Sequence, residues 1–105
     1  MALALENLSL QKTPTIAFIG DMFEVGKTAK QEHQDILELA KKLNINEVFA
    51  IGPSFGESNP LSKQKKYLTF KKFKEDFSYN IPKNSTILIK GSRGMQMERV
   101  LDLLK

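Results

Sequence analysis

Residues Ile87–Arg99 read Ile-Leu-Ile-Lys-Gly-Ser-Arg-Gly-Met-Gln-Met-Glu-Arg and pass from a short apolar run into a basic turn punctuated by glycine. The apolar run indicates a buried strand, and apolar side chains at helical spacing follow the turn. Backbone N–H groups at a helix start attract anions, and Lys90, Ser92 and Arg93 add two cations and a hydroxyl there. The stretch therefore predicts a strand, an anion-binding turn and a helix, in that order.

A second apolar run, Thr15–Ile19, ends in a loop of the opposite charge. This loop begins Gly20-Asp21-Met22-Phe23-Glu24 and carries two carboxylates. Because the carboxyl ends of neighbouring parallel strands meet at one edge of a sheet, we expect the acidic and basic loops to face each other. A charged small molecule held between them is the function that this arrangement favours.

Strand and helix patterns alternate along the rest of the chain. This alternation predicts an α/β fold, a Rossmann-like three-layer sandwich with a mostly parallel sheet in the order 3-2-1-4. We expect a single domain over residues 1–105, with residues 1–13 as a linker or short helix. The further predicted strands are Glu47–Ile51, Tyr67–Phe70 and Thr86–Ile89; the predicted helices cover 28–43, 71–77 and 95–104.

Two of the predicted helices have an apolar face that we expect to be buried. The residues of these faces recur every three or four positions, as an amphipathic helix requires. They are Ile36, Leu39, Ala40 and Leu43 in the first helix, and Met97, Val100, Leu101 and Leu104 in the last.

The composition is that of an ordinary globular protein, with 41% hydrophobic and 27% charged residues among 105. No apolar run approaches the roughly 20 residues that cross a bilayer, so we expect a cytoplasmic protein without membrane insertion. The chain has no cysteine and one histidine, which argues against a structural zinc site, and we expect no metal site. A monomer is the expected state.

The net charge is +4, and the positive charges are unevenly distributed: six lysines lie between positions 63 and 74. A basic cluster with interleaved aromatic residues is one mark of nucleic-acid binding. A solvated edge of the domain explains the same lysines, and we expect no nucleic-acid partner.

The acidic loop and the single histidine allow two interpretations each. Asp21 and Glu24 either receive a cation, such as a substrate ammonium, or serve as caps for loop and helix starts. His33 is either a packed helical residue or a polar group lining the site, and it is a possible proton acceptor. Gly26-Lys27-Thr28 looks like the end of a phosphate-binding loop, but five residues separate it from Gly20 where that motif requires four.

The basic turn favours a binding role more strongly. A buried strand that ends in Lys90, Ser92 and Arg93 is expected to meet an anion, and Arg93 can bind a carboxylate with two hydrogen bonds. The alternative is a salt bridge from Arg93 or Lys90 to Asp21 that holds the loops together. Glu98 follows one turn later and either pairs with these loops or faces solvent.

Both loops resemble motifs of one enzyme family. Residues Gly20–Gly26 followed by Glu32-His33 resemble the pattern Gly-Asp-Met-x-Glu-Leu-Gly…His, and Lys90–Glu98 resembles Lys-Gly-Ser-Arg-x-Met-x-Met-Glu. Together they resemble the C-terminal domain of the Mur ligases that add D-alanyl-D-alanine to UDP-N-acetylmuramoyl-tripeptide. The resemblance covers essentially the whole chain. Val25 departs from the usual Leu, and Lys27-Thr28 stands where the family carries acidic or small polar residues.

The resemblance implies an ATP-dependent ligase of peptidoglycan synthesis with three domains, of which this chain is the third. In such enzymes ATP and Mg²⁺ convert the peptide carboxylate into an acyl phosphate, which the amine of D-alanyl-D-alanine attacks. It also implies that ATP and UDP-N-acetylmuramoyl-tripeptide are bound through other domains, and that this domain alone is inactive. The resemblance and the charge pattern together predict that Asp21, Glu24, Lys90, Gly91, Ser92 and Arg93 bind the dipeptide. The alternative is a free-standing α/β module that binds a small molecule or nucleotide.

Overall fold

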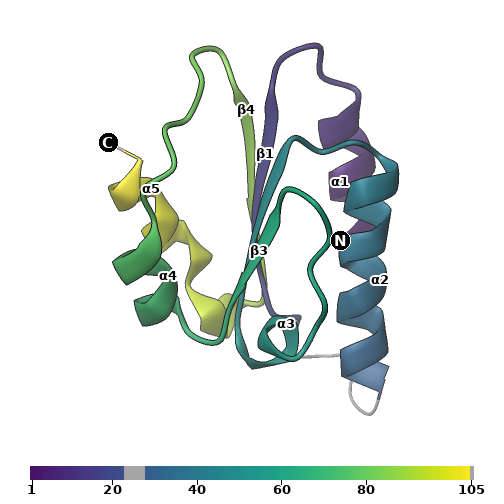
Figure 1. Cartoon of the computed structure of the whole chain (residues 1–105), viewed down its shortest axis with the longest axis vertical. Coiled ribbons are helices and arrows are strands. Elements are labelled where there is room, and N and C mark those ends of the chain that lie inside the picture. The colour runs from purple at the N-terminus through teal and green to yellow at the C-terminus, as the bar shows by residue number, and fades with distance from the viewer. Residues whose placement is uncertain (23–27, 105) are drawn as a thin grey trace.

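The structure, a computed structural model that describes residues 1–22 and 28–104, contains one sheet with helices on both faces (Figure 1). Its four strands are parallel and lie in the order β3-β2-β1-β4, which confirms the predicted fold class and strand order. The strands are β1 (Thr15–Gly20), β2 (Glu47–Ile51), β3 (Gln64–Tyr67) and β4 (Thr86–Lys90).

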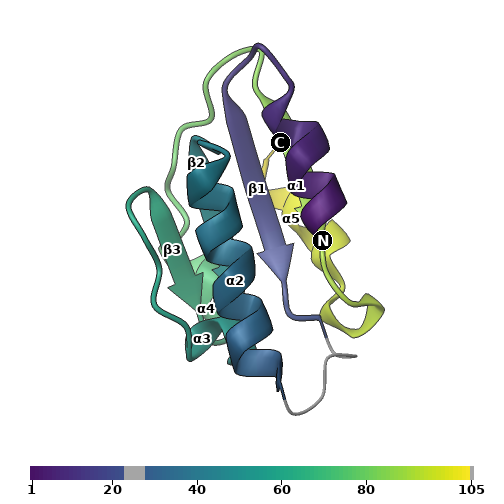
Figure 2. The same cartoon turned by 90° about the vertical axis from the view of Figure 1, so that its right-hand side faces the viewer.

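Helices occupy both sides of the sheet. On one side are α1 (Ala2–Ser9), α2 (Ala29–Lys42) and the short α3 (Pro53–Gly56), and Figure 2 shows α1 and α2 side by side over that face. On the other are α4 (Phe70–Asp76), two 3₁₀ turns, η2 (Arg93–Met95) and η3 (Met97–Arg99), and α5 (Val100–Leu103). The N-terminal segment is thus a packed helix, because Leu5 and Leu8 are buried in the core.

Alternate residues of a strand point to opposite faces, so the sheet separates two cores. These cores differ in composition. Ala17 and Ile19 of β1 face α1 and α2, where the core is largely aliphatic. Ile16 and Phe18 face α4 and α5, where aromatic rings dominate; Phe18 stacks on Phe49 with their centroids 5.1 Å apart. All six residues of β1 are buried, as expected for a central parallel strand.

Two details of the sequence prediction, the third strand and the last helix, are wrong, and the predicted face of the long helix is right only in part. The third strand is Gln64–Tyr67, not 67–70, because Thr69 ends the extended segment and caps α4 by accepting a hydrogen bond from the Lys72 N–H. The long helix buries His33, Leu37 and Ala40, while Ile36, Leu39 and Leu43 are only partly buried. A continuous helix over 95–104 is absent: Gln96 has a left-handed backbone (φ 49°) that divides the segment, and Leu101 is 53% exposed.

Candidate functional site

The basic turn lies where β4 ends, beside the end of β1, and it lines a pocket of about 400 Å³. The strand β4 is at the edge of the sheet, and Lys90 and Arg93 are exposed. The pocket-lining residues come from β4, the turn and the segment that follows: Ile89, Lys90, Gly91, Ser92, Arg93, Met97, Glu98 and Leu101. The structure therefore brings the four predicted residues of the basic turn together in one hollow.

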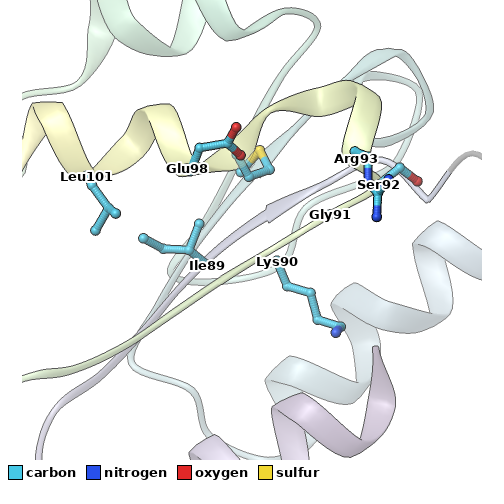
Figure 3. A pocket seen from close by; sticks show the side chains of 8 residues that line it. Ile89, Lys90, Gly91, Ser92, Arg93, Glu98 and Leu101 are labelled. Carbon is cyan, nitrogen blue, oxygen red and sulfur yellow. The ribbon is translucent and has the colours of Figure 1, made fainter.

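The pocket has charged groups of both signs and an apolar wall (Figure 3). Ile89 and Lys90 point to opposite sides of β4: Ile89 toward Glu98 and Leu101, and Lys90 toward the helices α1 and α2. The Glu98 carboxylate is thus on the other side of the strand from the Lys90 ammonium. With Arg93, Glu98 and the apolar Ile89 and Leu101 in its lining, the hollow suits a small ligand that carries a carboxylate, an ammonium group and short apolar side chains.

Close packing under the turn explains why position 91 is a glycine. A Cβ added to Gly91 would lie 2.9 Å from Cγ of Met97 and 3.0 Å from Cα of Gly20. Met97 is buried, so it cannot swing into solvent without opening the core. The ends of β1 and β4 approach each other closely because neither carries a side chain at this point.

Asp21, predicted to receive a cation, is buried with only 2% of its surface exposed. Its carboxylate accepts hydrogen bonds from the backbone N–H groups of Ser54 (2.7 Å) and Phe55 (3.0 Å) at the start of α3. Its carbonyl oxygen accepts the N–H of Ser92 at 2.9 Å. The acidic and basic loops are therefore joined by a backbone hydrogen bond, and within the described residues the Asp21 carboxylate accepts from the amides of α3.

His33 is fully buried at the first turns of α2. Its Nε2 accepts the Met22 N–H at 3.0 Å, and its Nδ1 lies 2.5 Å from the Ala29 carbonyl oxygen. Because a carbonyl can only accept, the hydrogen-bond network assigns the proton to Nδ1 and leaves Nε2 as an acceptor. The Nε2–Asp21 Oδ1 distance is 3.8 Å, so in this conformation both ring nitrogens have backbone partners.

Two further predictions have different outcomes. Glu24 and the Gly26-Lys27 pair lie outside the described residues. Glu98 received two interpretations from the sequence, and the structure places it in the pocket wall. The signal that identifies Glu98 is its spacing: it follows Arg93 by five residues across two 3₁₀ turns that double back over the strand end.

Three further observations concern the rest of the described residues. No group of three His, Cys, Asp or Glu side chains within 1–22 and 28–104 could hold a metal ion. None of the helices in these ranges has the length and hydrophobicity to span a membrane. Lys65 and Lys66 are exposed on the edge strand β3, and the Lys66 ammonium donates to the Ser58 carbonyl oxygen at 2.8 Å.

Comparison with known proteins finds ligases to which this chain is similar. The chain is 36% identical over 94 residues to a UDP-N-acetylmuramoyl-tripeptide--D-alanyl-D-alanine ligase of Buchnera aphidicola, covering 86% of this chain and 21% of the relative. It is 29% identical to the Borreliella burgdorferi ligase of the same name, covering 98% of this chain and 24% of that protein. No family model matches the chain.

Two solved structures share the fold. The MurF ligase of Thermotoga maritima, in complex with ADP, superposes with a TM-score of 0.78 at 23% identity over 96% of this chain and 24% of that protein. MurF of Acinetobacter baumannii gives a TM-score of 0.76 at 25% identity over 96% of this chain and 23% of its own. The chain is therefore homologous to part of the UDP-N-acetylmuramoyl-tripeptide--D-alanyl-D-alanine ligases, MurF, and spans less than a quarter of their length.

Proposed function

We propose that the chain is the domain of such a ligase that receives D-alanyl-D-alanine, within a longer cytoplasmic enzyme of peptidoglycan synthesis. The observation that carries the proposal is the pocket at the carboxyl end of β4, built by the turn Lys90–Arg93. In open parallel sheets, ligands bind beyond the carboxyl ends of the strands. We further propose that ATP, Mg²⁺ and UDP-N-acetylmuramoyl-tripeptide bind to other parts of that enzyme, so that this chain alone does not catalyse ligation.

The dipeptide is a zwitterion with two methyl side chains, and each part has a proposed partner. We assign its carboxylate to the guanidinium of Arg93, which can form two parallel hydrogen bonds, with Ser92 beside it. Contact of the dipeptide with Lys90, whose ammonium lies on the other side of β4, stays a prediction. The methyl groups would pack against Ile89 and Leu101. Partly exposed apolar walls of this kind add affinity through the water that they release.

We assign the ammonium end of the dipeptide to the Glu98 carboxylate. The amine must lose a proton before it attacks the acyl phosphate, and a carboxylate within hydrogen-bond reach can accept that proton. Both ring nitrogens of His33 are engaged by backbone groups, so we place this role on Glu98 rather than on His33. Contact of the dipeptide with Asp21 or Glu24 stays a prediction.

An NMR titration of the ¹⁵N-labelled 105-residue protein tests the proposal. D-alanyl-D-alanine should shift the amides of residues 89–98, whereas L-alanyl-L-alanine should shift them less at equal concentration. ATP is titrated separately, and shifts of the same amides by ATP alone would favour a nucleotide-facing role for this pocket. No shift at millimolar D-alanyl-D-alanine would contradict the proposal that this chain by itself carries the dipeptide site.

A further inference from the structure

The first residue after β1 contacts three other parts of the fold. The Asp21 N–H donates to the Ile51 carbonyl at the end of β2 (3.1 Å), and its carbonyl accepts the Ser92 N–H (2.9 Å). Its carboxylate accepts the N–H groups of Ser54 and Phe55 at the start of α3. One buried residue thus connects the ends of β1 and β2, the start of α3 and the basic turn.

The carboxylate acts as the cap that α3 lacks in its own sequence. The residue before α3 is Gly52, which has no side chain to offer and forms no side-chain cap. Its φ of 133° is a conformation that favours glycine, and a Cβ there would lie 2.4 Å from Cγ of Asp21. The backbone of residues 52–55 is therefore wrapped around the Asp21 carboxylate.

His33 fixes the next residue of the same loop. Its Nε2 accepts the Met22 N–H, while its Nδ1–H donates to the Ala29 carbonyl one turn earlier in α2. The ring packs edge-on against Phe55, with a centroid separation of 4.6 Å. The imidazole thereby ties Met22 to α2 and to the helix that Asp21 caps.

We infer that Asp21 and His33 are positioning residues, which set the place of the basic turn by fixing the Asp21–Met22 peptide. The Asp21 carbonyl holds the Ser92 N–H, so a shift of that peptide moves the turn with it. The inference rests on the proposed function only in taking D-alanyl-D-alanine as the ligand of the turn. This role explains why the Gly-Asp-Met motif is followed eleven residues later by a histidine: both residues serve the same peptide.

Variants of both residues test the inference. Asp21→Asn keeps the shape of the side chain but turns an NH₂ group toward one of the α3 amides. His33→Leu removes the acceptor of the Met22 N–H, and His33→Gln restores one. The control is Tyr67→Phe, which removes the hydrogen bond from the Tyr67 hydroxyl to Asp76 on the other face of the sheet.

Three measurements are made on each protein. Long-range ¹H–¹⁵N spectra report the tautomer of His33, hydrogen exchange reports the Ser92 amide, and titration gives the dissociation constant for D-alanyl-D-alanine. We expect the Nδ1–H tautomer in the unmodified protein. In Asp21→Asn and His33→Leu we expect exchange of the Ser92 amide at least about tenfold faster and a dissociation constant raised at least about threefold. His33→Gln should recover most of both changes, and Tyr67→Phe should alter neither.

The outcomes separate this inference from the proposed function. If the unmodified protein does not bind the dipeptide, the proposed function fails, while the tautomer and the Ser92 exchange still decide the positioning role. Binding that is unchanged in Asp21→Asn and His33→Leu overturns the inference, even if Ser92 exchanges faster. An Nε2–H tautomer also overturns it, and that result needs no variant that folds.

Discussion

The loops at the ends of β1 and β4 carry charges side by side in space but use them in opposite ways. In the described part of the loop after β1 the charge is buried: the Asp21 carboxylate is enclosed by backbone amides of α3. The charges at the end of β4 are exposed: Lys90 and Arg93 line an open pocket. The first loop organises the second through the hydrogen bond from the Ser92 N–H to the Asp21 carbonyl.

This difference shows that the sign of a charge at a strand end does not decide its role. A buried carboxylate that is satisfied by N–H groups is costly to remove, because the donors are then left without partners. An exposed guanidinium costs little to remove from the fold and is available to a ligand. We therefore expect variants of the loop after β1 to lower stability and variants of the loop after β4 to weaken binding. The following variants test this difference.

The largest expected effect is that of Asp21→Ala on stability. Removing the carboxylate leaves the Ser54 and Phe55 amides without their acceptor, and we expect the free energy of unfolding to fall by about 3 kcal/mol. Urea denaturation followed by circular dichroism measures it. The matched control is Asp35→Ala on the exposed face of α2, expected to change stability by less than about 0.5 kcal/mol. Equal losses in the two variants would refute the structural role of Asp21.

Gly91→Ala should affect both properties, because Gly91 lies where the two loops touch. The added Cβ meets Met97 and Gly20, and overpacking of this kind should cost about 2 kcal/mol of stability. The turn must move to relieve the contact, so dipeptide binding should weaken as well. Gly94→Ala, at an exposed position of the same turn, is the control. A Gly91→Ala protein that keeps its stability and binds normally would show that the loops are less tightly packed than the structure indicates.

Arg93→Ala should affect binding alone. Loss of the charge-assisted hydrogen bonds should raise the dissociation constant for D-alanyl-D-alanine about tenfold, equivalent to about 1.4 kcal/mol. The free energy of unfolding should change by less than about 0.5 kcal/mol, because the side chain is exposed. NMR titration and urea denaturation measure the two quantities. Lys72→Ala, which removes one positive charge on α4, should leave the dissociation constant unchanged; if it weakens binding equally, the effect is one of net charge.

The sequence predicted the strands of the sheet interior because their signals are local. Each of Thr15–Gly20 and Glu47–Ile51 is a short apolar run bounded by polar or turn residues, and burial on both faces requires that composition. The strand Gln64–Tyr67 was misplaced because Lys65 and Lys66 are exposed there, so that it lacks the apolar run that marks β4, the other edge strand.

The candidate site was predictable in part for the same reason. Lys90 and Arg93 are three residues apart, so the turn alone places both at the end of β4. The burial of Asp21 depends on residues 33 and 34 positions later, Ser54 and Phe55, and on the backbone that Gly52 permits. No local pattern contains that information. The residues around Asp21 would read the same whether its carboxylate caps a helix or binds a ligand.

The smallest expected effect tests whether burial makes a polar group structural at a second position, away from the two loops. Tyr67 is buried on the α4 face and its hydroxyl donates to Asp76 at 2.7 Å. Burial first, and then the hydrogen bond and charge of Asp76, raise the pKa of Tyr67 above its ordinary value of 10.0. A group whose pKa is higher in the folded state contributes stability that is complete below the unfolded pKa and is lost as the pH rises through the folded one.

The free energy of unfolding should therefore fall as the pH is raised above about 10, and part of that fall should disappear in Tyr67→Phe. At neutral pH the variant should lose about 1 kcal/mol, the net worth of one hydrogen bond. Tyr79, whose pKa is raised by burial and then by Glu47, stays in both proteins, so the difference between the two pH profiles isolates Tyr67. Identical profiles above pH 10 would mean that burial of a polar group in this fold does not by itself make it structural. The structural role of Asp21, in contrast to the binding role of Arg93, would then come from its hydrogen bonds to α3 and not from its burial.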